Sequence, residues 1–85
     1  MPKQRRDSIP ALVLAVIAQV YELSGHRTQP WYIDRSALDL ADSDRVNSAI
    51  YYAEVSGWLV GAREPPLSVA ITADGVRLLE ESGLI

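Results

Sequence analysis

Side chains that can hydrogen-bond to nucleic-acid bases and phosphates are clustered near the middle of the chain. They recur at three- and four-residue spacing, which is typical of one side of a helix. An asparagine can bond two atoms of an adenine edge, and an arginine can bind guanine or phosphate. Serine and tyrosine hydroxyls can bond phosphates or base edges. The candidate contacts are Arg45, Asn47, Ser48, Tyr51 and Tyr52.

The same stretch has a simpler interpretation. Asp44 and Glu54 lie on or beside this side of the helix, and carboxylates repel phosphates. A solvated helix face whose tyrosines pack on neighbouring residues would show the same pattern. Both interpretations stay open at this point.

Other basic residues extend the candidate set. Arg63 falls at the tip of an expected hairpin, where it can reach a phosphate or a minor groove, although Glu64 beside it opposes that role. Arg35 falls in the first turn of an expected helix. There it can bind a nucleic-acid backbone or form an ion pair with Asp34 or Asp39. The N-terminal segment is a basic arm that can bind a duplex or act only as a solubilising tail. Its charges are Lys3, Arg5 and Arg6.

The sequence gives little support for catalysis or metal binding. His26 is the single histidine, and there is no cysteine, so neither a metal site nor a catalytic triad is indicated. The acidic stretch at 39–44 lacks the glycine and the later glutamate of a calcium loop, and helix capping explains it more simply. No phosphate-binding glycine motif is present. We therefore expect no enzyme activity, no catalytic or metal-binding residues and no cofactor.

Composition and charge indicate one folded domain. The 85 residues are 48% hydrophobic and 22% charged, which fits a small domain with one core. The absence of cysteine fits a reducing cytoplasm, and the longest apolar run, 11–18, is too short to span a membrane. Asp7 and Pro10 argue against a secretory signal. Residues 1–6 carry a charge of +3 and residues 7–85 a charge of −6, so the body should repel nucleic acid at long range.

The elements that would position these side chains can be read from the apolar spacing. After an arm at 1–8, a helix is expected from about residue 9 to 23, capped by Asp7 or Ser8 and ended by Gly25. A connector follows, with a short extended piece at 31–33. Asp34 should cap a short helix to residue 40 or 41 that buries Ile33, Ala37, Leu38 and Ala41. A further helix should run from 43 to 55 or 56 and bury Val46, Ala49, Ile50 and Ala53.

In the last third of the chain, the spacing of apolar residues changes from the helical period to the alternation of a strand. Residues 58–62 and 67–72 have strand character, with Trp58, Val60, Val69 and Ile71 as core positions. The stretch at 63–66, which ends in two prolines, fits a hairpin tip. Thr72 should cap a last helix that packs through Val76, Leu78, Leu79 and Leu84. Gly75 should allow that helix to approach a neighbour closely.

Two stretches carry a resemblance to a known family. "RVNSAIYYAEVSGWLV" (45–60) resembles a recognition helix and the entry to a wing, and "SVAITADGVRLLE" (68–80) resembles the second wing strand and the last helix. The chain thus resembles the winged helix-turn-helix domains of small prokaryotic and phage regulators, broadly MarR-like and PadR-like. The resemblance implies an α+β, mostly helical fold over residues 9–85. This fold has three helices, a two-stranded β-hairpin wing and a short C-terminal helix.

The resemblance also implies a function. The third helix would enter the major groove of double-stranded DNA, and the wing and arm would contact the backbone or minor groove, as in a transcriptional regulator. The alternative is a winged-helix module that binds another protein, which the acidic body and the clustered tyrosines favour. Because the order of the elements matches a winged helix, DNA binding is the leading hypothesis.

A second apolar stripe on the first helix raises the question of a partner. Its residues lie away from the main apolar face, and so short a chain has few residues to cover both. We expect a homodimer through this stripe, although burial under the arm or the C-terminal residues is an alternative. The stripe consists of Ala11, Leu14, Ala18 and Tyr21.

Overall fold

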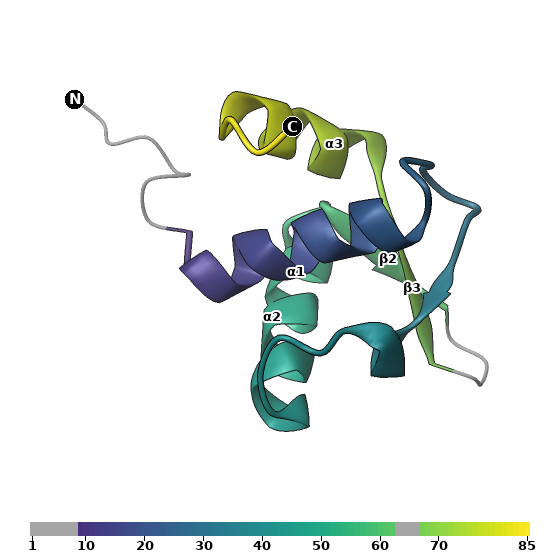
Figure 1. Cartoon of the computed structure of the whole chain (residues 1–85), viewed down its shortest axis with the longest axis vertical. Helices are drawn as coiled ribbons and strands as arrows, with labels where there is room; N and C mark the ends of the chain where they lie inside the picture. Colours follow the sequence, from purple (N-terminus) through teal and green to yellow (C-terminus); the bar gives the residue numbers. More distant parts are fainter. Residues whose placement is uncertain (1–8, 63–66) are drawn as a thin grey trace.

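The computed structural model describes residues 9–62 and 67–85 (Figure 1). The described residues form an α+β fold in which helices make up about half of the chain, rather than most of it. The basic arm at 1–8 and the hairpin tip at 63–66 lie outside the described residues. In chain order the elements are α1 (Ala11–Leu23), β1 (Ile33–Asp34), η2 (Arg35–Ala37), α2 (Ser43–Val55), β2 (Leu59–Gly61), β3 (Ser68–Ile71) and α3 (Ala73–Glu81).

The core lies where α1 contacts α2, α3 and β3, and α1 runs between α2 and α3 (Figure 1). The predicted inward face of α2 is confirmed, because all four of its residues are buried. Gly25 follows the C-cap of α1 at φ +71°, the left-handed conformation that glycine adopts without strain. The buried residues of the two helices are Val13, Val16, Ile17 and Val20 in α1, and Val46, Ala49, Ile50 and Ala53 in α2.

The predicted hairpin is present and belongs to a larger sheet. β2 pairs with β3 in antiparallel fashion, and β1 pairs with the other edge of β3, which gives the order β1-β3-β2. The two-stranded wing expected from the sequence is therefore a three-stranded sheet. Ile33, which the sequence placed in a short extended piece, pairs with Val69.

The register of the hairpin corrects one predicted core position. Leu59 is opposite Ile71, and Gly61 is opposite Val69. Directly opposed residues point to the same face of a sheet, so the burial of Val69 and Ile71 places Leu59 in the core. Leu59 is only 2% exposed, whereas Val60, the predicted core residue, is half-buried.

The prediction of an α-helix after Asp34 is also wrong. Within the described residues a three-residue 3₁₀ turn, η2, takes the place of the α-helix expected up to residue 40 or 41. Asp34 caps this turn as predicted, but the backbone of Leu38 is already extended, which carries its side chain into the core. Ala37, expected to be inward, is exposed. Two α-helices joined by a turn are therefore not found in this part of the chain.

The last helix follows the prediction closely. The Thr72 Oγ1 accepts a hydrogen bond from the Gly75 N–H at 3.0 Å, which caps α3. A Cβ on Gly75 would meet the Trp58 carbonyl oxygen and would lie 2.7 Å from Cγ1 of Ile71, so the close approach requires glycine. Leu78 and Leu79 are buried, whereas Leu84 is exposed and does not join the core as expected.

Candidate nucleic-acid interface

The outer side of α2 is uncovered along its whole length. Asp42 starts the helix, since its carboxylate accepts from the Arg45 N–H at 3.0 Å. Because the helix buries one side against α1, its opposite side faces solvent. Tyr51 is 68% and Val55 is 70% exposed. The exposed side chains on this outer face are Asp44, Asn47, Ser48, Tyr51 and Val55.

Arg35 of η2 reaches across to one flank of this face. Its Nη1 donates to Oδ1 of Asn47 at 3.4 Å, and its Nη2 donates to Oε2 of Glu54 at 3.3 Å. The Arg35 side chain is 24% and the Glu54 side chain 27% exposed, so the ion pair is half-buried. The sequence left open an ion pair of Arg35 with Asp34 or Asp39. Its partner in the structure is Glu54.

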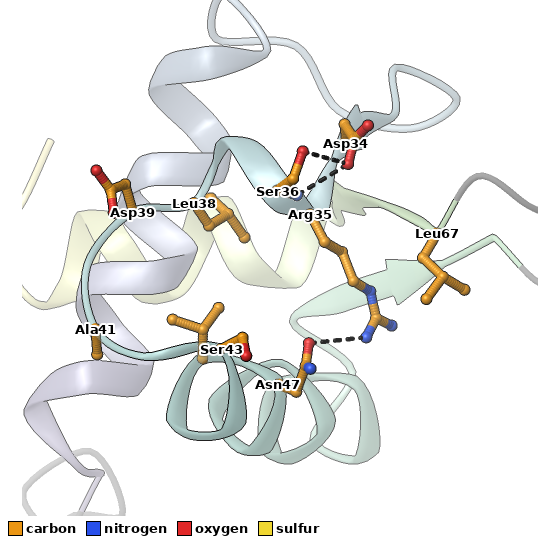
Figure 2. A pocket seen from close by; sticks show the side chains of 10 residues that line it. Asp34, Arg35, Ser36, Leu38, Asp39, Ala41, Ser43, Asn47 and Leu67 are labelled. Carbon is orange, nitrogen blue, oxygen red and sulfur yellow. Dashed lines mark hydrogen bonds between the residues drawn. The ribbon is translucent and has the colours of Figure 1, made fainter.

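Asp34 has a different role, because it holds η2 in shape. Its Oδ1 accepts from both the backbone N–H and the hydroxyl of Ser36, each at 2.9 Å (Figure 2). These two hydrogen bonds, the backbone one first, hold the pKa of Asp34 below its ordinary value of 3.8. The Arg35 N–H in turn donates to the Leu67 carbonyl oxygen at 3.2 Å, which ties the turn to the sheet.

A groove of about 550 Å³ separates η2 from α2. Figure 2 shows Arg35 extending along it toward Asn47, with Leu38 and Ser43 further along the same groove. Its lining combines two carboxylates with the Arg35 guanidinium, hydroxyls and apolar groups, so it does not select one charge. The groove borders the Asn47 flank of the outer face.

The other flank of α2 borders the start of α1. There Arg45, Ser48 and Tyr52 line a groove of about 420 Å³ together with Pro10 and Leu12. Tyr52 also stacks on Trp58, with ring centroids 6.2 Å apart. The candidate contacts thus divide between two flanks, with Tyr51 on the exposed side between them.

Most arginines of the described residues already have partners. Arg27 lies over the ring of Trp31 at 4.2 Å, and Arg77 bonds Asp74 at 2.9 Å. With Arg35 held by Glu54, Arg45 is the described arginine whose guanidinium has no recorded partner. The described ranges contain four arginines and nine acidic residues, so positive charge is scarce on this surface. Four further candidate contacts lie outside the described residues, namely Lys3, Arg5, Arg6 and Arg63.

The second stripe of α1 is partly covered within the chain. Leu14, Ala18 and Tyr21 are half-buried and pack against the core, whereas Ala11 is exposed. Tyr21 also stacks on His26, with ring centroids 4.5 Å apart and nearly parallel planes. His26 in turn bonds Glu22 at 3.1 Å. The stripe still reaches the surface, and its role as a dimer interface remains a prediction.

The roles of two residues in this region were not predicted from the sequence. Glu54 counted only as an unfavourable charge, although it lies seven residues after Asn47 and therefore on the same side of α2. Gly61 received no role, yet a Cβ there would meet Oε2 of Glu54. A glycine inside a strand is a known sign of close approach, and this was the available signal.

Two features are absent from the part of the chain that the structure describes. Residues 9–62 and 67–85 hold no group of three or more histidine or acidic side chains placed to bind a metal ion. No helix formed by these residues has the length and apolar character needed to cross a bilayer. Comparison of the chain with protein-family models, with curated proteins and with solved structures found no match.

Proposed function

We propose that the chain is a small DNA-binding domain of a transcriptional regulator, with the arrangement of a winged helix. The observation that carries this proposal is the uncovered outer side of α2, which presents Asn47, Ser48 and Tyr51 beside the β2–β3 hairpin. An exposed helix of this kind fits the major groove. The order of elements, with a short strand before η2 and a hairpin after α2, supports the same arrangement. Such a role would place the protein in the cytoplasm.

In this proposal the contacts have different tasks. Asn47, Ser48 and Tyr51 face the base edges, and Arg45 and Tyr52 bind phosphates on the flank nearest α1. Arg63 and the arm residues Lys3, Arg5 and Arg6 add the positive charge that the rest of the chain lacks. The acidic remainder of the domain faces away from the duplex.

A titration with pooled random-sequence duplexes at low salt tests the proposal. Wild type should shift the duplexes, and affinity should fall steeply with salt, because each phosphate contact contributes about 0.9 to the logarithmic slope. Arg45→Ala should reduce that slope by about 1. Arg77→Ala is the matched control: it removes the same charge from α3, away from the proposed face, and should leave the slope unchanged.

Two results would overturn the proposal. One is the absence of any shift for wild type at low salt. The other is a loss that is equal for Arg45→Ala and Arg77→Ala, because this would mean that net charge alone governs binding.

A second candidate function is a protein-interaction module. The observation that favours it is the pair Tyr51 and Val55, one turn apart and each about two-thirds exposed, on a surface with few free cations. Affinity capture should then yield one stoichiometric protein partner. Tyr51→Ala should abolish that capture, while Tyr32→Ala, an exposed tyrosine on the connector before β1, should not. If Tyr51→Ala weakens only DNA binding, this second function is wrong.

We also propose that two copies associate through the α1 stripe. A two-fold axis there would present two α2 helices to a palindromic site. The exposed Ala11 and the partly exposed Leu14, Ala18 and Tyr21 would supply the contact.

A further inference from the structure

We propose that Arg35 is a positioning residue that orients the Asn47 side chain for base recognition, and that Glu54 and Gly61 hold Arg35 in place. This inference rests on the proposed DNA-binding function. It assigns Arg35 a task different from the phosphate contact that its position beside α2 suggests. It also makes Asn47 the residue that selects a base.

The hydrogen bond between Arg35 and Asn47, which is long at 3.4 Å, favours one orientation of the amide. A guanidinium group has only donors, so the Asn47 atom that faces it must be the carbonyl oxygen Oδ1. The Nδ2 group, with two donors, is then directed away from Arg35 (Figure 2). Oδ1 keeps one free lone pair, so the amide can still accept one bond and donate another. This is the pair of bonds by which an asparagine recognises the N6 and N7 atoms of adenine.

The other end of the Arg35 fork is held from the side of the sheet. Oε2 of Glu54 accepts from Nη2, one nitrogen away from the bond to Asn47. Asn47 and Glu54 are two turns apart on the same side of α2, so one planar guanidinium can bridge both. A Cβ on Gly61 would meet Oε2 of Glu54 and would lie 3.4 Å from Nη2 of Arg35. Gly61 therefore leaves the space that the carboxylate occupies.

The backbone of Arg35 is anchored as firmly as its side chain. Its N–H bonds the Leu67 carbonyl oxygen, and Asp34 fixes the turn that begins at Arg35. Because Arg35 is held through both its backbone and its guanidinium, Asn47 loses little conformational freedom when it binds a base. Such preorganisation lowers the entropic cost of binding. A guanidinium that is half-buried and already paired with a carboxylate is a poor anchor for a phosphate.

Arg35→Lys separates the positioning role from a phosphate contact. Lysine keeps the charge but lacks the planar fork. It would therefore pair with the Glu54 carboxylate and leave Oδ1 of Asn47 without a fixed donor. The probe is the set of duplexes that wild type selects from a random pool, with the Asn47-dependent base pair identified by Asn47→Ala. We expect Arg35→Lys to lower the preference for adenine at that position about tenfold and to leave the salt slope unchanged. Arg77→Lys is the control and should change neither quantity.

Two further variants change the groups that hold Arg35 on the side of Glu54. Glu54→Gln frees the Arg35 charge, so a phosphate contact predicts tighter binding with an unchanged preference for adenine. The positioning role predicts that the preference falls. Gly61→Ala should also lower the preference, although it lies in β2 and removes no polar group.

A measurement on the free protein keeps the inference distinct from the proposed function. The Asn47 side-chain NH₂ should give ordered NMR signals in wild type, with a ¹⁵N relaxation close to that of the backbone, and averaged signals in Arg35→Lys. Equal mobility in the two proteins would overturn the inference. Binding with the same base preference in wild type and Arg35→Lys would overturn it as well. If wild type binds no duplex although the amide is ordered, the proposed function fails and base reading by Asn47 fails with it.

Discussion

The hydroxyl of Thr72 donates a hydrogen bond to the carbonyl oxygen of Gly57 at 2.7 Å. The Thr72 Oγ1 also accepts from the Gly75 N–H, so one side chain caps α3 and ties its first turn to the residue that follows the C-cap of α2. The Thr72 N–H adds a third link, to the Trp58 carbonyl oxygen at 3.1 Å. The position of α3 on the core thus depends strongly on this threonine.

Thr72→Ala should lower the free energy of unfolding by about 2 kcal/mol, because it removes a helix cap and a bond between two elements. Urea denaturation followed by circular dichroism measures the change. Thr72→Ser keeps the hydroxyl and should recover most of the loss. An equal loss for serine would show that the methyl group, rather than the hydrogen bonds, is responsible.

Gly75→Ala should destabilise the fold by about 1–3 kcal/mol, although alanine is the better helix former. The added methyl group would collide with the Trp58 carbonyl oxygen and with Ile71. Glu80→Ala, at an exposed position of the same helix, should change stability by no more than about 0.5 kcal/mol. A stabilised Gly75→Ala protein would contradict the close approach of α3 to Trp58.

Leu59→Ala should cost about 2–5 kcal/mol, because it leaves a cavity in the core. Val60→Ala should cost clearly less, since Val60 is half-buried and faces the other side of the sheet. The denaturation midpoints of the two variants test the strand register directly. The reverse order would mean that Val60, as the alternating pattern first indicated, is the core residue.

Acid should remove the contribution of Asp34 to stability. The pKa of Asp34 in the folded chain lies below its ordinary value of 3.8, so the carboxylate stabilises the fold above that pH. The contribution is lost as the pH falls through the lowered value. Asp34→Ala should therefore be less stable than wild type at about pH 6, and the difference should shrink toward about pH 2. A difference that is independent of pH would exclude the carboxylate as its source.

Wild type should have twice the mass of one chain in light scattering, and Ala11→Glu should be a folded monomer. Ala11 is the better probe of the α1 stripe, because Leu14 also packs against the core, and Leu14→Glu could unfold the chain. Leu23→Glu, on another side of α1 and exposed, is the matched control and should stay dimeric. A wild-type monomer at high micromolar concentration would leave the stripe explained by contacts within the chain.

Local signals were sufficient to predict the three α-helices and the hairpin. The apolar spacing of α2 predicted each of its buried residues, and Thr72 caps the last helix as predicted. Asp34 is also a cap, although it begins a 3₁₀ turn and not the expected α-helix. These features depend on neighbours within about a turn of helix, which a single sequence records well.

The failures concern contacts between distant residues. The sequence indicated an extended piece at Ile33, but no local pattern shows that this residue pairs with the distant Val69 in a third strand. Leu38 leaves the helical path to reach the core, which overrides the moderate helix propensity of its segment. At the candidate interface the residue types were identified from the sequence. The bridge from Arg35 to Asn47 and Glu54 was not, because it joins η2 to two turns of α2.

The pairing of β1 with β3 has a consequence for how the chain reaches its native state. Thirty-five of the 85 residues lie between Ile33 and Val69, so a long loop must close before these strands meet. The pairing of β2 with β3 is more local, since Leu59 and Ile71 are only 12 residues apart in sequence. The attachment of β1 therefore carries a larger loop-closure cost than the hairpin. Because η2 begins directly after β1, we expect the Arg35 bridge to be secured by this attachment rather than by the hairpin alone.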